Sequence, residues 1–224
     1  MTNSVSIAVT NARVLTLNPP GAGDGPRRGA DLSELGILDR GWILVREGRI
    51  ADLGRGTPPT FAPEIRVIDA QGRVVMPALV DCHTHACFLG DRNDEFEARL
   101  AGASYLEILA AGGGIMSTVR SVRAASEPEL VDALRRRLEQ TARLGTGTIE
   151  VKSGYGLDPE TELKMLRAIR TAAERSPQVV VPTFLGAHAL DSDAEDPAHA
   201  VEQIIAEALP AAAAAFPGIV CDAY

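Results

Sequence analysis

Over the first 75 residues, short runs of β-branched and apolar residues alternate with segments rich in Gly, Pro and charge. This pattern predicts strands joined by turns, because β-branched side chains favour an extended backbone. The expected strands are residues 6–10, 13–17, 42–45, 49–53 and 66–69, with turns at Glu47-Gly48 and Gln71-Gly72 and a loop over 19–40. Residues 1–75 are therefore predicted to form the N-terminal part of a small β-sandwich domain.

The pattern changes around Pro77. Residues 74–80 are almost continuously apolar, as is typical of a strand buried on both faces. Residues 147–151, 179–185 and 218–221 show the same character. We expect these four runs to be strands of one parallel sheet.

Helical patterns separate the four runs. Ser126-Glu127-Pro128-Glu129 is a capping box, and a helix is expected from there to Gly145. Asp158-Pro159 predicts the start of a second helix, running to about Arg175. A third is expected over 198–215, with Val201, Ile204 and Ile205 facing inward. Strands alternating with helices predict an α/β fold, and residues 76–224 offer about four βα units, the first half of a TIM barrel of ~250 residues.

Composition narrows the class of protein. A hydrophobic content of 46% allows a sizeable core, and a net charge of −8 argues against a nucleic-acid partner. No apolar run of about 18 residues is present, so no membrane span is expected, and residues 1–5 do not resemble a secretory signal. The three cysteines are interpreted as reduced, mostly buried thiols, which predicts a cytoplasmic protein.

The segment Asp81-Cys82-His83-Thr84-His85 carries the first candidate chemistry. On a strand, side chains two apart point to the same face, so His83 and His85 are expected to project together from a strand end, where parallel α/β enzymes place their active sites. Imidazole is a common ligand for Zn²⁺ and Fe²⁺. The alternative is two histidines that are close by chance.

Three further residues follow the predicted strands. Arg92 lies in a strand-to-helix loop, where its guanidinium is suited to capture a carboxylate, but the sequence alone favours a solvated loop arginine near Asp91 and Asp94. Tyr155 lies between two glycines after the second strand of the sheet, and His188 ends the third. Together with the histidine pair they predict a pocket. His199 is interpreted as a surface residue.

These stretches, read together, resemble the imidazolonepropionase family of the amidohydrolase superfamily. The likeness covers nearly the whole chain, and only the Gly/Pro-rich stretch 19–29 departs from it, as an extra loop expected to lie far from the site. The matching runs are Asp81-Cys82-His83-Thr84-His85, Glu95-Phe96-Glu97-Ala98-Arg99-Leu100, Ala111-Gly112-Gly113-Gly114-Ile115, Glu150-Val151-Lys152-Ser153-Gly154-Tyr155-Gly156-Leu157 and Thr183-Phe184-Leu185-Gly186-Ala187-His188.

The resemblance implies a partial metal-dependent-hydrolase (β/α)8 barrel and a reaction. The family hydrolyses 4-imidazolone-5-propanoate to N-formimino-L-glutamate in histidine degradation, using one Zn or Fe ion held by the His-x-His pair, a later His and a later Asp. By this resemblance His83 and His85 are metal ligands, and Arg92, Tyr155 and His188 contact a small substrate that bears a carboxylate. The complete protein is expected to be a homodimer.

Residues 1–224 supply two of the implied ligands, and the other two are expected beyond residue 224. We therefore expect this polypeptide alone to bind metal weakly and to have little activity. The alternatives are another amidohydrolase, acting on a cyclic amide or a purine-like ring, and an inactive or split fragment that needs a C-terminal partner. Lys152 is expected to be salt-bridged or packed in its loop rather than to bridge two metals.

Overall fold

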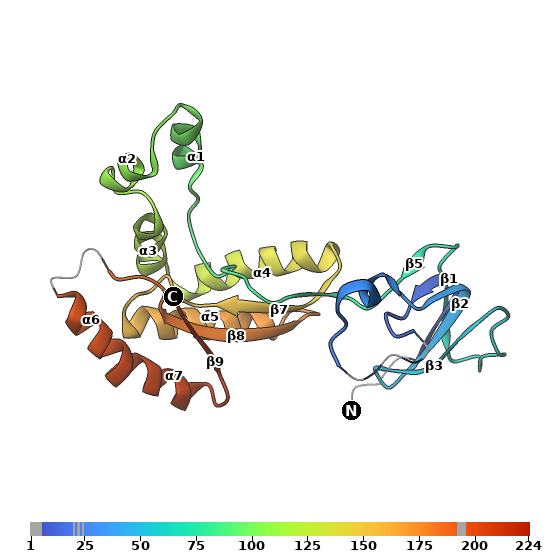
Figure 1. Ribbon diagram of the computed structural model, residues 1–224. Helices are drawn as coiled ribbons and strands as arrows, with labels where there is room; N and C mark the ends of the chain where they lie inside the picture. Colours follow the sequence, from blue (N-terminus) through green and yellow to red (C-terminus); the bar gives the residue numbers. More distant parts are fainter. Residues whose placement is uncertain (1–5, 20, 22, 24, 192–195) are drawn as a thin grey trace. The chain divides into compact units, whose positions relative to one another are not determined.

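The computed structural model describes residues 6–19, 21, 23, 25–191 and 196–224 (Figure 1). The chain divides into two compact units, Met1–Pro77 and Ala78–Tyr224. The expectation that residues 1–5 do not form a secretory signal falls on residues outside the described part of the chain.

The N-terminal unit is built on a mixed five-stranded sheet. Its strands are β1 (Ile7–Leu15), β2 (Ile37–Arg46), β3 (Arg49–Arg55), β4 (Arg66–Asp69) and β5 (Val74–Val75), and a short 3₁₀ helix, η1 (Gly29–Ser33), precedes β2. The order is β3-β2-β1-β4, with β5 also on β1. β1 and β3 are antiparallel to β2, whereas β4 and β5 run parallel to β1.

The predicted hairpin is confirmed. Glu47 and Gly48 connect β2 to β3 with φ of 53° and 72°, and two positive φ values are typical of the two-residue turn that matches strand twist. Side chains of β2 alternate between the faces of the sheet. Trp42 and Leu44 pack in one cluster, and Ile43 packs in another.

The prediction of two strands over 6–10 and 13–17 is wrong, because one strand, β1, runs through most of both ranges. Its pairing with β2 is irregular between Val9 and Ala12, where Asn11 has a φ of 51°. Such a bulge kinks a strand without ending it. Propensity patterns cannot distinguish this kink from a turn.

The interpretation of residues 74–80 as one buried strand is also wrong. The run is divided between β5 in the first sheet and β6 (Leu79–Asp81) in the second. Pro77, between them, has no N–H to donate to a ladder. Val74, on β5, is 53% exposed. Val80, on β6, is 68% exposed, because β6 is an edge strand of the described sheet and Val80 faces an open cavity.

The C-terminal unit contains a four-stranded sheet in the order β6-β7-β8-β9, and all neighbouring strands are parallel. The further strands are β7 (Thr146–Lys152), β8 (Val179–Ala187) and β9 (Val220–Ala223). The helices are α1 (Asn93–Leu100), α2 (Tyr105–Ala110), α3 (Ile115–Ala124), α4 (Glu127–Arg143), α5 (Pro159–Ala173), α6 (Pro197–Gln203) and α7 (Leu209–Ala215). The α/β prediction of a parallel sheet is confirmed.

Helices α4 and α5 pack beside each other against the sheet and form the main core with it. The predicted N-terminal caps of both helices, Ser126 and Asp158, are confirmed. The Glu129 carboxylate accepts the Ser126 backbone N–H at 2.8 Å, and the Asp158 carboxylate accepts the Thr161 backbone N–H at 2.8 Å. On α4 the buried residues are Leu130, Val131, Ala133, Leu134 and Leu138.

The predicted helix over 198–215 is interrupted by a π-helical turn, η2 (Ile204–Ala208). Pro210 has no N–H for the carbonyl four residues before it, which favours this wider turn. Ile204 packs against the core, whereas Val201 is 42% and Ile205 63% exposed. The expectation that Val201 and Ile205 face inward is wrong.

Helices α1, α2 and α3 were not predicted. They form an excursion between β6 and α4, and Figure 1 shows α1 and α2 projecting away from the sheet. The capping box of α2, where the Glu107 carboxylate accepts the Ser104 N–H at 2.7 Å, was a readable signal in the sequence.

Candidate active site

The His-x-His segment follows β6 and is anchored to β7 by its middle residue. The Thr84 N–H donates to the Glu150 carboxylate at 3.0 Å, and its hydroxyl donates to the Glu150 carbonyl at 2.5 Å. The Lys152 N–H donates in return to the Thr84 carbonyl at 3.0 Å. Thr84 therefore fixes where the two flanking histidines project. The same-face geometry that the sequence suggested is achieved just beyond the strand rather than inside it.

Four of the candidate side chains form one cluster of rings. The centroids of His83 and His85 are 5.5 Å apart, and His85 stacks on His188 at 4.6 Å with 21° between the planes. Tyr155 lies 5.7 Å from His85 and 5.4 Å from His188. Loops after three different strands therefore meet at the carboxyl edge of the sheet, as the order of the residues along the chain predicted.

The histidine pair fits two positions of a metal site. His85 Nδ1 is buried and has no hydrogen-bond partner. Burial, then His188 and His83, lower the pKa of His85 to about 4, so its imidazole is neutral at physiological pH, the form that binds metal. Among the described residues no group of three His, Cys, Asp or Glu side chains is arranged to hold an ion. Catalytic zinc usually takes three protein ligands.

Lys152 is salt-bridged, as expected. Its ammonium lies 2.7 Å from the Glu150 carboxylate and 2.8 Å from the Asp222 carboxylate, and the side chain is 5% exposed. Burial alone would lower the pKa of Lys152, but the hydrogen bonds to Asp222 and Glu150 outweigh burial and raise it. Lys152 thus joins β7 to β9 and supports the Glu150 carboxylate that holds Thr84.

The hydrogen bond of His188 defines which of its nitrogens carries hydrogen. Nδ1 lies 2.7 Å from the Gly154 carbonyl oxygen. A carbonyl can only accept, so Nδ1 is the protonated nitrogen and Nε2 of the neutral ring is an acceptor. Burial raises the pKa of Tyr155, so the phenol keeps its proton. The cluster therefore combines a hydroxyl donor with a ring acceptor.

Arg92 joins the cluster through a shared cavity of about 290 Å³. Arg92 and Tyr155 both line it, together with Phe88 and Thr118. The Arg92 Nε donates to Glu95 at 2.8 Å, and the other oxygen of Glu95 accepts the Gly114 N–H at 3.0 Å. The Arg92 Nη2 donates to the same Glu95 oxygen as Nε, at 2.5 Å, so Glu95 holds the guanidinium in place, and the side chain is 45% exposed and thus accessible to an anion.

The inner face of the sheet borders a second, open cavity of about 460 Å³. Cys82 and Cys221 line it and are exposed, and only Cys87 is buried, so the expectation of mostly buried thiols is wrong. Burial raises the pKa of Cys87 to about 12, which keeps it an unreactive thiol. His199 is exposed, as predicted.

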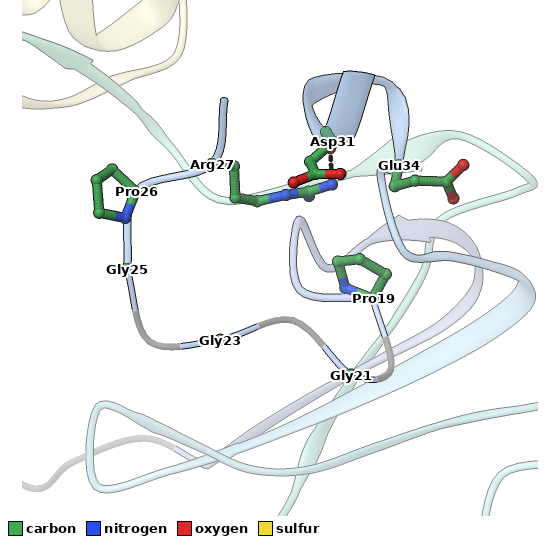
Figure 2. A pocket seen from close by; sticks show the side chains of 8 residues that line it. All are labelled: Pro19, Gly21, Gly23, Gly25, Pro26, Arg27, Asp31 and Glu34. Atoms are coloured by element: carbon green, nitrogen blue, oxygen red, sulfur yellow. Dashed lines mark hydrogen bonds between the residues drawn. The ribbon is translucent and has the colours of Figure 1, made fainter. Parts of the chain in front are cut away.

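The N-terminal unit has a hollow of about 520 Å³ beside its Gly/Pro-rich stretch (Figure 2). Among the described residues, Arg27, Asp31 and Glu34 are the charged ones that line it, and the Arg27 guanidinium donates to the Asp31 carbonyl. This cation is therefore already bonded within the hollow, and we assign no site there. The distance of this stretch from the histidine cluster stays a prediction.

The sequence is similar to known enzymes over most of its length. It is 52% identical to "Imidazolonepropionase" of Rubrobacter xylanophilus over 197 aligned residues. The aligned region covers 85% of this chain and 47% of that protein. The match to the protein of the same name in Halobacterium salinarum is 46% over 222 residues, 99% of this chain and 52% of the relative.

The chain belongs to the imidazolonepropionase family. It spans about half the length of the curated relatives that it matches. No protein-family model matches it.

Solved structures confirm the fold class. A 5-methylcytosine deaminase from Klebsiella pneumoniae superposes with a TM-score of 0.54 at 15% identity, over 90% of this chain and 41% of that one. A triazine hydrolase variant superposes with a TM-score of 0.54 at 14% sequence identity, over 91% of this chain and 43% of that one. The C-terminal unit of this imidazolonepropionase-family chain is thus part of a (β/α)8 barrel. None of the described helices combines the length and the apolar character that a membrane-spanning segment requires.

The sequence did not single out Thr84, Glu150 or Glu162 as parts of the site. Glu162 had a readable signal, because it shares a helical face with the apolar Met165, Leu166 and Ile169. A carboxylate on a core-facing position needs partners.

Proposed function

We propose that this protein hydrolyses the cyclic amide of 4-imidazolone-5-propanoate to N-formimino-L-glutamate. The observation that carries the proposal is the cluster of His83, His85, Tyr155 and His188 beside a cavity that Arg92 lines. The family assignment supports it, because imidazolonepropionase is the name of the relatives at 46–52% identity.

The histidine pair would hold one Zn or Fe ion, for which imidazole is a suitable ligand. Such an ion makes hydroxide available at neutral pH by lowering the pKa of bound water to ~7. His85 presents a neutral, unpartnered nitrogen for this purpose. Thr84, held by Glu150, keeps the spacing of the two imidazoles.

The remaining residues bind and orient the substrate. Arg92, with Glu95 behind it, would take the propionate carboxylate, since guanidinium binds carboxylate in a bidentate fashion. The Tyr155 hydroxyl would donate to the ring, and Nε2 of His188 would accept a ring N–H. Two contacts at the ring and one at the carboxylate would fix a planar substrate in one orientation.

A chimera tests the proposal. The chain is fused to the part of the Rubrobacter xylanophilus relative that has no counterpart in it, and the intact relative is the positive control. We expect the purified, folded chimera to consume 4-imidazolone-5-propanoate and to form a product heavier by one water. A folded chimera that binds metal and leaves the substrate unchanged would overturn the proposal.

The isolated chain provides the second arm of this experiment. We expect weak metal binding and little turnover, because the described residues supply two ligands of the usual three. Stoichiometric, tight metal and normal turnover in the isolated chain would contradict that expectation. Homodimer formation and a cytoplasmic location stay predictions, and size-exclusion chromatography with light scattering on the chimera tests the first.

A further inference from the structure

A buried carboxylate lies behind the substrate-facing rings. Glu162 is on α5, is 1% exposed, and shares the core face of that helix with Met165, Leu166 and Ile169. A carboxylate placed among such neighbours destabilises the fold unless hydrogen bonds satisfy it. The hydrogen-bond partners of the Glu162 carboxylate therefore indicate which part of the structure it stabilises.

The Glu162 carboxylate accepts three backbone N–H groups from the loop that follows β7. Oε2 accepts the Gly154 N–H at 2.8 Å, and Oε1 accepts the N–H groups of Gly156 and Leu157 at 2.7 and 3.0 Å. These residues lie on both sides of Tyr155. The carboxylate thus fixes the backbone on each side of the tyrosine.

The same loop holds His188, whose Nδ1 lies 2.7 Å from the Gly154 carbonyl. A Cβ at Gly154 would lie 3.1 Å from that nitrogen, and one at Gly156 would lie 2.6 Å from the Glu162 backbone nitrogen. The two glycines around Tyr155 let the loop close tightly on Glu162 on one side and on His188 on the other.

Arg123 holds the same loop from α3. Its Nε donates to the Gly156 carbonyl at 2.9 Å, and its guanidinium pairs with Asp158 at 3.2 Å and Asp191 at 2.7 Å. Arg123 binds a carbonyl of the loop, whereas Glu162 binds its N–H groups. Of Arg123 and Glu162, it is Glu162 that bonds to Gly154, the residue whose carbonyl bonds to His188.

We propose that Glu162 is a positioning residue that sets the orientation of both Tyr155 and His188 toward the substrate. It acts through the Gly154 backbone and touches neither the substrate nor the metal. The inference rests on the proposed function, because that function assigns Tyr155 and His188 to the substrate. The orientation of the two rings can nevertheless be measured without substrate.

Glu162→Gln tests the inference in the isolated 224-residue chain. The glutamine oxygen can still accept from Gly156 and Leu157, but its NH₂ group then meets the Gly154 N–H, and two donors cannot bond. Glu160→Gln is the matched control, because Glu160 is an exposed carboxylate in the same first turn of α5.

Nuclear magnetic resonance of the metal-free chain gives the readouts. In Glu162→Gln we expect the ¹⁵N shift of His188 Nδ1 to move from the protonated tautomer toward a mixture, and the Tyr155–His188 ring contact to weaken. We also expect the Gly154 amide to exchange faster by about tenfold or more. Glu160→Gln should leave all three unchanged.

An unchanged His188 tautomer and ring contact in folded Glu162→Gln would overturn the inference, even with a lower melting temperature, because that result describes a purely structural carboxylate. If Glu162→Gln does not fold, Glu162→Asp decides by the same readouts, since its shorter carboxylate keeps the charge but cannot reach all three N–H groups. Loss of turnover in the chimera with unchanged ring geometry would count against the proposed function and not against this inference.

Discussion

The imidazoles of His85 and His188 stack with 4.6 Å between their centroids and 21° between their planes, although they follow different strands of the sheet. His85 keeps a buried nitrogen without a hydrogen-bond partner, whereas His188 is fixed by the Gly154 carbonyl. Two adjacent imidazoles with different partners can serve different purposes. In the proposed function, His85 would bind the metal and His188 would face the substrate.

Removal of the histidine pair should abolish zinc uptake by the isolated chain. Because His83 and His85 are the two candidate ligands, replacing either by Ala should weaken zinc binding by at least about tenfold. Isothermal titration of the metal-free chain with zinc measures this. His199→Ala, on exposed α6, is the control, and equal zinc binding by all three variants would contradict the assignment.

Thr84→Val should loosen the histidine segment. Valine has the shape of threonine but lacks the hydroxyl that donates to the Glu150 carbonyl, so we expect a loss of about 1 kcal/mol in the free energy of unfolding. Urea titration followed by circular dichroism at ~222 nm reports the C-terminal unit, where the α-helices lie. The fluorescence of Trp42, the chain's one tryptophan, reports the N-terminal unit and should not change.

Thr148→Val on β7 is the matched control for Thr84→Val. It makes the same chemical change on a half-buried strand position. Equal losses in the two variants would show that the Thr84 hydroxyl contributes nothing particular to the segment.

The ion pair of Arg92 with Glu95 should give a pH-dependent stability. The hydrogen bond from Arg92 holds the pKa of Glu95 below its ordinary value. A carboxyl with a lowered folded pKa stabilises the fold fully above its unfolded pKa, and the contribution is lost as the pH falls through the folded pKa. Glu95→Gln should therefore be less stable than the parent at neutral pH, by under about 1 kcal/mol.

That difference should become smaller between neutral pH and about pH 3.5, because the pH then falls below the ordinary pKa of a glutamate and towards the lowered folded pKa of Glu95. Thermal unfolding of the parent and Glu95→Gln at both pH values provides the comparison, with Glu97→Gln on the exposed face of α1 as control. A difference between parent and Glu95→Gln that is the same at both pH values would rule out the ion pair as its source.

Much of the fold was readable because local signals agreed with tertiary packing. Several local patterns are each compatible with a single structure. They are the Glu47-Gly48 turn, the Ser126 and Asp158 caps, and the apolar runs of β7 and β8. The errors lie where a local signal depends on distant partners. The run around Pro77 reads as one strand, but which sheet each half joins is decided by β1 and β7.

The sequence predicted which side chains form the site, but it did not predict the residues that hold these side chains in place. His83, His85, Tyr155 and His188 could be brought together because carboxyl ends of parallel strands share an edge. Glu150 and Glu162 act through backbone groups, and of the two only Glu162 left a pattern in the sequence, its position on the apolar face of α5. The π turn at Ile204–Ala208 was likewise not predicted, because helical periodicity assumes a regular helix, and Val201 and Ile205 are exposed although the pattern placed them inward.

The interaction between Arg92 and the substrate carboxylate tests the central claim most directly. The chimera and its Arg92→Ala variant are each assayed with 4-imidazolone-5-propanoate and with the corresponding propionamide, and Arg99→Ala on α1 is the control. We predict that Arg92→Ala raises KM about tenfold or more for the propionate and hardly changes it for the amide. Equal changes for both compounds, or none for the propionate, would contradict the account.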